Sequence, residues 1–172
     1  MTDAAVVSAT TGRQKPSRQQ VWDFATAWFL ALDMHAPEET CLAFLADDGL
    51  KMIFPEQTLE GTGDFRAWYR GGICADGTTM PGVVNVFFDE NHTLKHVDVA
   101  PVEEGVMADV LVGWQASWFV PPAAKSRRTS LDAVQRWTLR PCKPTKNSFG
   151  MEIVGYDAMA EPFRYGPGFA AL

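Results

Sequence analysis

Three ionisable side chains lie an even number of residues apart in one short segment of the chain. His92, His96 and Asp98 would share one face of a regular strand, because alternate side chains point the same way. One metal ion could not easily bind both histidines, since strand residues four apart are separated by about 13 Å at about 3.3 Å per residue. His96 with Asp98 stays open as a metal pair, but the pattern favours a hydrogen-bonded pair in a pocket, and we predict no metal.

Aromatic residues form the second candidate group. The 172 residues include six Trp and eleven Phe, and a small domain this rich in large rings often lines a cavity as well as a core. Tyr69 could also donate a hydrogen bond to a carbonyl or an enolate. The rings that we place around one apolar cavity are Trp28, Tyr69, Trp114, Trp118 and Trp137. Together they predict a flat hydrophobic small molecule as ligand, although a ring taken alone is more often plain core.

Sequence motifs for other chemistries are missing. The chain has no nucleophile elbow, no glycine loop for a phosphate and no dinucleotide fingerprint. An enzyme with this sequence would therefore transfer protons without a cofactor, in an isomerisation, a dehydration or a cyclisation. We accordingly predict no cofactor.

These side chains need elements to position them, and the first half of the chain predicts three helices around one strand. Ser17 is a plausible N-cap, and apolar residues recur every three or four positions from Val21 to Leu32. We expect that helix to end before Pro37, because the residue before a proline avoids helical dihedral angles. The predicted elements are a helix over 17–35, a helix over 37–48, a strand over 50–54 and a helix, capped by Thr62 or Asp64, over 62–70.

The second half of the chain predicts an antiparallel sheet after a long loop over 71–82. Apolar and alternating runs predict its strands, over 83–89, 93–101, 107–120, 130–140 and 149–158. Turns at 89–91 and 103–105 and other short connections imply that neighbouring strands run antiparallel. Segment 107–120 is apolar on both faces, so we expect helices on one face and a second subunit on the other, in a homodimer formed through the outer sheet face.

One folded domain is predicted over residues 17–158. Residues 1–16 are small and polar and are predicted to be a loose tail. Segment 159–172 has two prolines and aromatic residues, and it could fold back over the cavity or reach a neighbouring subunit. Lys125, Arg127 and Arg128 are expected to lie in a solvated loop.

The charge and cysteine content bound the partners and the compartment. A net charge of −6 opposes binding to nucleic acid or to an anionic membrane, because both require a positive field. No segment reaches the roughly 20 apolar residues that cross a bilayer. The three cysteines are scattered without metal-ligand spacing and the N-terminus does not have the pattern of a signal peptide, so we predict a reduced, cytoplasmic setting.

The order of elements resembles the nuclear transport factor two-like superfamily, which has a cystatin-like α+β fold. The matching text is WxFAxAWFxALD, CLAFLADDGLKMIFPE and LEGTGDFRAWY, followed by HTLKHVDV, ADVLVGWQASW, QRWTLR and MEIVGYDA where long strands belong. The members that look most similar are the SnoaL-like polyketide cyclases, ketosteroid isomerases, scytalone dehydratase and the lindane dehydrochlorinase. Over 17–158, the resemblance implies a cone-shaped, strongly curved antiparallel sheet wrapped around three N-terminal helices, with an internal cavity.

The resemblance also implies an acid–base pair. In several lyases of this superfamily, an Asp at the end of the first helix orients a His on an early strand, and that His acts as general base. Asp33 matches the first position, and His92 lies near the second, with His96 as its rival. An imidazole titrates near neutrality and a buried carboxylate fixes its tautomer, so this chemistry is reasonable. The alternative is that Asp33 caps the helix and His92 lies in an exposed turn.

A different base is used by the ketosteroid isomerases, which place an Asp in the first strand before a proline. Phe54 occupies that position here, so the mechanism lacks its proton carrier unless Glu56 replaces it, and Glu56 is more plausibly a rim carboxylate. We place Phe54, Glu56 and Asp98 with the tryptophans in the ligand-binding set. The leading expectation is a small-molecule-binding protein that acts as a lyase, isomerase or cyclase, and the alternatives are a non-catalytic ligand-binding module or an assembly protein.

Overall fold

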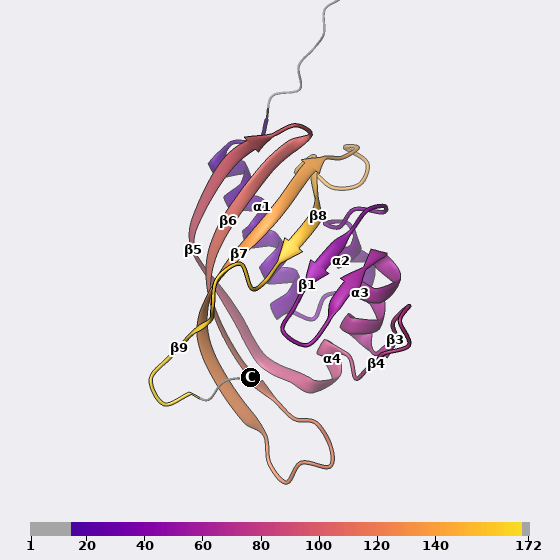
Figure 1. The fold of residues 1–172 in the computed structure, drawn as a ribbon, viewed down its shortest axis with the longest axis vertical. Coiled ribbons are helices and arrows are strands. Elements are labelled where there is room, and N and C mark those ends of the chain that lie inside the picture. Colours follow the sequence, from indigo (N-terminus) through magenta and orange to yellow (C-terminus); the bar gives the residue numbers. More distant parts are fainter. Residues whose placement is uncertain (1–14, 170–172) are drawn as a thin grey trace, which may run out of the picture.

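The computed structural model describes residues 15–169 (Figure 1). Its helices are α1 (Arg18–Asp33), α2 (Glu38–Leu42), α3 (Gly61–Arg70) and α4 (Val83–Val86). Its strands are β1 (Lys51–Ile53), β2 (Thr58–Glu60), β3 (Gly72–Ile73), β4 (Thr79–Met80), β5 (Phe87–Val102), β6 (Gly105–Trp118), β7 (Arg127–Pro141), β8 (Met151–Asp157) and β9 (Arg164–Tyr165). None of the helices in this described part is long and apolar enough to span a membrane.

Helix α1 begins where the sequence predicts. The Ser17 hydroxyl accepts a hydrogen bond from the Gln20 backbone N–H, and the Gln20 side chain accepts one from the Ser17 N–H. This reciprocal pair satisfies two backbone donors that a helix start would otherwise leave free. The buried residues of α1 lie on one stripe, which includes Phe24 and Trp28.

The main sheet is open and has the strand order β2-β1-β8-β7-β6-β5, with β9 added beside β7. Figure 1 shows the long strands β5, β6 and β7 bending along their length, with the N-terminal helices gathered against them. The predicted α+β fold is confirmed. All pairings in this sheet are antiparallel except that of β1 with β8, where Lys51 lies opposite Gly155 in a parallel register.

The core lies between the concave face of the sheet and the helices. Trp28 from α1 and Trp137 from β7 are fully buried in it. Both rings contact Tyr156 of β8, at centroid distances of 6.2 and 5.3 Å. Inward-facing residues alternate along β7 from Thr129 to Leu139, as expected for a sheet with one buried face.

Several local predictions were wrong in the segments between the core elements. Residues 83–86 form α4 instead of a strand, since Gly82 at φ 91° starts a turn that the Asn85 amide stabilises through bonds to the Arg70 and Pro81 carbonyls. Helix α3 begins at Gly61, and Asp64 instead accepts bonds from the backbone N–H groups of Glu60 and Ala75.

Two further corrections concern the loop over 71–82 and the second predicted helix. The loop contains the β3–β4 hairpin, where Gly72 pairs with Met80. Helix α2 ends at Leu42, well before 48.

The predicted turn at 89–91 is a β-bulge inside β5. Asp89 has φ 53°, and the pairing with β6 shifts register between Phe88 and Asn91. A second shift lies between Leu94 and His96. Each bulge adds a residue and reverses which side chains face inward.

The C-terminal segment folds back onto the domain. Tyr165 in β9 pairs with Leu131 in β7, and the Phe163 ring lies against the Tyr165 ring at 6.3 Å. The predicted N-terminal tail lies outside the described residues except for Lys15 and Pro16.

Candidate active site

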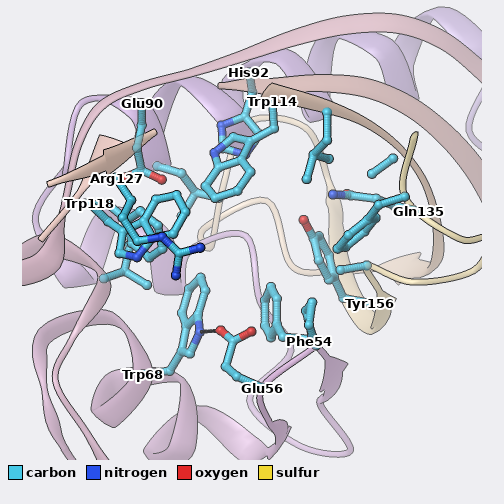
Figure 2. Close-up of a pocket in the computed structure, with 18 residues that line it drawn as sticks. Phe54, Glu56, Trp68, Glu90, His92, Trp114, Trp118, Arg127, Gln135 and Tyr156 are labelled. Atoms are coloured by element: carbon cyan, nitrogen blue, oxygen red, sulfur yellow. Dashed lines mark hydrogen bonds between the residues drawn. The ribbon is translucent and has the colours of Figure 1, made fainter. Parts of the chain in front are cut away.

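A cavity of about 270 Å³ is lined by the first part of β5, the last part of β6 and the first part of β7, together with the ends of α1 and α3 (Figure 2). Its wall is mostly apolar and includes six Phe and Trp side chains: Phe54, Trp68, Phe87, Trp114, Trp118 and Phe163. Polar groups interrupt this wall at six positions: Glu56, Glu90, His92, Arg127, Gln135 and Tyr156. A few polar groups in an apolar hollow are typical of a small-molecule site.

His92 is held by Asp33 through two hydrogen bonds. Its backbone N–H donates to Asp33 Oδ2 at 2.8 Å, and its Nδ1 lies 2.5 Å from Asp33 Oδ1. A carboxylate only accepts, so Nδ1 carries a proton, and in the neutral ring Nε2 then keeps its lone pair. The two side chains are 10% and 12% exposed, so solvent does little to weaken this contact.

Neighbouring rings fix the plane of the imidazole. Phe29 stacks on His92 with centroids 4.7 Å apart and planes 11° apart, and Trp114 lies on another side at 6.2 Å. Figure 2 shows the His92 ring at the cavity wall with Trp114 beside it. The bulge at Asp89 makes this possible, because it turns both Glu90 and His92 inward after the inward-facing Phe87.

A second acid–histidine contact lies next to the first. Glu90 Oε2 is 2.7 Å from Nε2 of His35, which follows the end of α1. The Glu90 side chain is only 5% exposed. Burial raises the pKa of Glu90, an effect that the contact with His35 partly offsets.

Hydrogen-bond donors also lie along the cavity wall. The Trp137 indole N–H donates to Gln135 Oε1 at 3.0 Å, which turns the Gln135 amide nitrogen toward the cavity, as Figure 2 shows. Burial raises the pKa of Tyr156, so its hydroxyl stays protonated. The buried indole N–H of Trp114 has no hydrogen-bond partner among residues 15–169. The side chains of Gln135, Tyr156 and Trp114 line the same cavity as His92.

The mouth of the cavity carries charge. The Arg127 guanidinium lies 5.1 Å from the Trp118 ring centroid, within the range of a cation–π contact, and forms no ion pair in the described part of the chain. Glu56 accepts a bond from the Trp68 indole N–H at 3.2 Å. Phe54 stacks on Trp68 with centroids 4.4 Å apart.

Several predicted site residues lie elsewhere. The prediction that His92, His96 and Asp98 share one face was wrong, because the bulge after Leu94 reverses the alternation. His96 and Asp98 form a 2.9 Å contact on the outer face, with side chains 47% and 72% exposed. Tyr69 donates to the Ala36 carbonyl at 2.7 Å and does not line the cavity.

The predicted aromatic set divides between core and cavity. Trp28 and Trp137 belong to the core, whereas Trp114 and Trp118 line the cavity. Sequence reasoning missed Glu90, Gln135 and Tyr156 and assigned Arg127 to a solvated loop, although Arg127 begins β7. Their inward position follows from strand register, which the sequence pattern does not reveal.

No protein-family profile matches the sequence, and no curated protein sequence matches it. Solved structures do match. A Novosphingobium aromaticivorans protein provisionally named an aromatic ring hydroxylase is 14% identical, with a TM-score of 0.61 over 89% of this chain and 96% of the other. A nuclear transport factor 2 (NTF2-like) superfamily protein from Salmonella enterica is also 14% identical, with a TM-score of 0.54 over 90% and 96%.

A third similar structure is an enzyme. The hexachlorocyclohexane dehydrochlorinase LinA-type3 from Novosphingobium barchaimii is 12% identical, with a TM-score of 0.55 over 90% of this chain and 93% of the other. At such low identities these matches establish the fold and not the activity. The chain therefore has the NTF2-like, cystatin-like fold that its sequence resembles.

Proposed function

We propose that this protein binds a hydrophobic small molecule and transfers a proton within it, without a cofactor, using His92 as general base. The observation that carries the proposal is the largely buried contact between Asp33 and His92, with the imidazole at the wall of an aromatic cavity. A histidine held by a carboxylate is suited to take a proton, because the carboxylate stabilises the resulting imidazolium.

The first chemical step would break a C–H bond next to an electron-withdrawing group. The proton moves to His92 Nε2, and the electron pair moves toward the withdrawing group. Negative charge that develops on an oxygen of the substrate would be stabilised by the amide of Gln135, the hydroxyl of Tyr156 and the indole N–H of Trp114. The reaction would then finish as an isomerisation, an elimination or a ring closure.

The cavity limits the substrate. Its volume of about 270 Å³ is close to the lower end of ligand pockets, which begin at about 300 Å³. Aromatic walls favour a flat compound. Arg127, which has no ion pair among residues 15–169, favours an electron-rich or anionic substituent at the mouth.

A base-only reaction tests the proposal without knowledge of the natural substrate. Nitrobenzisoxazole is flat and aromatic, and removal of its one acidic C–H opens the ring to a coloured nitrophenolate. We expect the protein to accelerate this elimination and His92→Ala to abolish the acceleration. His96→Ala is the matched control, because it removes a histidine from the outer face. Equal activity of folded wild-type and His92→Ala proteins would refute the role of His92.

Non-catalytic ligand binding is the second candidate, and the predominance of apolar over polar residues in the cavity wall supports it. Quenching of Trp fluorescence by aromatic compounds, without turnover of any of them, would favour this function. The two candidates share the cavity and differ only in the need for Asp33 and His92.

We also propose that the protein forms a homodimer through the outer face of the sheet. Leu111 and Val134 lie opposite each other there and are half-buried in a single chain. Ion pairs flank them, Asp109 with Arg136 and Lys95 with Asp132, and could cross to a partner. Analytical ultracentrifugation of wild-type and Leu111→Glu proteins tests this, with a monomeric wild type as the contrary result.

A further inference from the structure

Glu90 and His35 form a second acid–histidine pair like that of Asp33 and His92, but here the acid lies on the strand and the histidine at the end of the helix. Asp33 and His35 lie at the end of α1, and Glu90 and His92 lie two residues apart on β5. The helix acid contacts the strand histidine, and the strand acid contacts the helix histidine, at 2.5 and 2.7 Å. Two ionisable pairs therefore lie at one wall of the cavity.

The second pair extends from the cavity toward the surface. Glu90 lines the cavity and its side chain is 5% exposed, whereas the His35 side chain is 27% exposed. Figure 2 shows the Glu90 carboxylate on the same side of the cavity as His92. A proton on Glu90 can thus reach a ligand, and a proton on His35 can exchange with water.

The pair is also held at a cost to the backbone. His35 has φ 45°, in the left-handed region that non-glycine residues seldom occupy. Such conformations persist where surrounding contacts fix them, and they are frequent at functional sites. A carboxyl group placed in an aromatic wall is itself unfavourable unless it has a partner.

We propose that Glu90 is a general acid that protonates the substrate, and that His35 returns the proton from solvent. This inference rests on the proposed function, since it supplies the acid that complements the base His92. It narrows the reaction to one that needs a proton delivered, namely a dehydration or an isomerisation. Loss of a halide, which leaves as an anion, needs no such acid.

In a dehydration of a β-hydroxy ketone the atoms balance as follows. His92 Nε2 takes the proton from the carbon next to the carbonyl, and that C–H electron pair forms the new C=C bond. The C–O bond breaks as Glu90 protonates the leaving hydroxyl, which departs as water. His35 Nε2 then gives a proton to Glu90 Oε2, and rotation of the carboxyl group returns that proton to the cavity. His92 releases its proton to solvent, and His35 takes one from solvent, which restores the starting state.

The charges around Glu90 fit an acid that is protonated more readily than usual. The ionisable groups that face it are His35 and Asp33 from the end of α1, Tyr69 from α3 and His92 from its own strand. Burial raises the pKa of Glu90, Asp33 adds to the rise, and the two histidines oppose it. Glu90 would therefore hold a proton at higher pH than a surface glutamate.

Two probes separate this inference from the proposed function. Nitrobenzisoxazole needs only a base, whereas the β-hydroxy ketone formed from acetone and para-nitrobenzaldehyde needs a base and an acid to lose water. We expect Glu90→Gln to lose the second activity by about 100-fold or more, the range for a general acid, and to lower the first far less. Glu60→Gln, which changes a distant exposed carboxylate, is the control.

His35→Gln tests the relay, because glutamine can still donate to Glu90 but cannot exchange a proton. We expect slowed dehydration that added imidazole restores, and a much smaller change in nitrobenzisoxazole turnover. Two results would overturn this inference alone. The wild type could eliminate nitrobenzisoxazole but fail to dehydrate the ketone, or folded Glu90→Gln protein could dehydrate the ketone at the wild-type rate. A wild type that turns over neither probe would refute the proposed function, and the inference with it.

Discussion

Replacing Asp33 with Asn perturbs the site at the contact on which its chemistry depends. The Asp33 carboxylate accepts two hydrogen bonds from His92, from the backbone N–H at 2.8 Å and from Nδ1 at 2.5 Å. Asparagine keeps one acceptor oxygen and turns an NH₂ group toward the other donor. A bond to a charged group contributes about 1.5–3 kcal/mol, so losing one slows the reaction about 10- to 160-fold.

The assay is the pH profile of nitrobenzisoxazole elimination, with circular dichroism to confirm folding. We expect kcat to fall more than KM rises, because Asp33 contacts His92 and not the ligand. Asp98→Asn is a matched control, since Asp98 also contacts a histidine, His96, at 2.9 Å, but on the outer face. If folded Asp33→Asn protein keeps wild-type kcat/KM, the carboxylate does not act through His92 and the reasoning fails.

Other predictions address the mouth, the core and the pH dependence of folding. Arg127→Leu should weaken binding of an aromatic carboxylate about tenfold, measured by Trp fluorescence, whereas Arg128→Leu, on the opposite face of β7, should leave it unchanged. Trp137→Ala should lower the free energy of unfolding in urea by about 3–5 kcal/mol, because the ring is fully buried; a surface-like loss would contradict its core position. The raised pKa of Glu90 means that its contribution to stability is present below the ordinary glutamate pKa of about 4.3 and is lost as pH rises through the folded-state value. Glu90→Gln should therefore become more stable relative to wild type as pH is raised from about 4 to about 7, and a pH-independent difference would argue against a shifted carboxyl.

Helix α1 and the succession of long strands along the chain could be predicted because their signals are local. The spacing of apolar residues from Val21 to Leu32 predicts α1, and Ser17 marks its start. Asp33 was assigned from the resemblance to lyases that place an Asp at the end of the first helix, an end that Pro37 makes visible in the sequence. The fold followed from the order of such elements.

The orientation of side chains on β5 could not be predicted in the same way. Alternation reveals which residues share a face only while the strand stays regular, and two bulges interrupt it. Asp89 has a positive φ although it is not a glycine, so the sequence does not mark the first bulge. Nothing in the sequence around Lys95 marks the second. One outcome is that His96 and Asp98 lie outside, and another is that Glu90 lies inside.

Core and cavity rings were equally hard to separate. Trp137 and Trp114 both follow the same apolar alternation, and both lie on the concave face of the sheet. What distinguishes them is whether a helix covers that part of the sheet. That coverage depends on where α1 ends against the long strands, which is a property of three-dimensional packing.

During synthesis, β1 leaves the ribosome long before β8, the strand beside which it finally lies. The roughly one hundred residues between them take about 5–20 s to translate at bacterial and eukaryotic rates. Until then Met52 has no neighbouring strand on the β8 side, and the Trp28 ring of α1 lacks its contact with Tyr156. The nascent N-terminal half is thus an incomplete apolar surface, and we expect it to be a client of ribosome-associated chaperones until the last long hairpin has emerged.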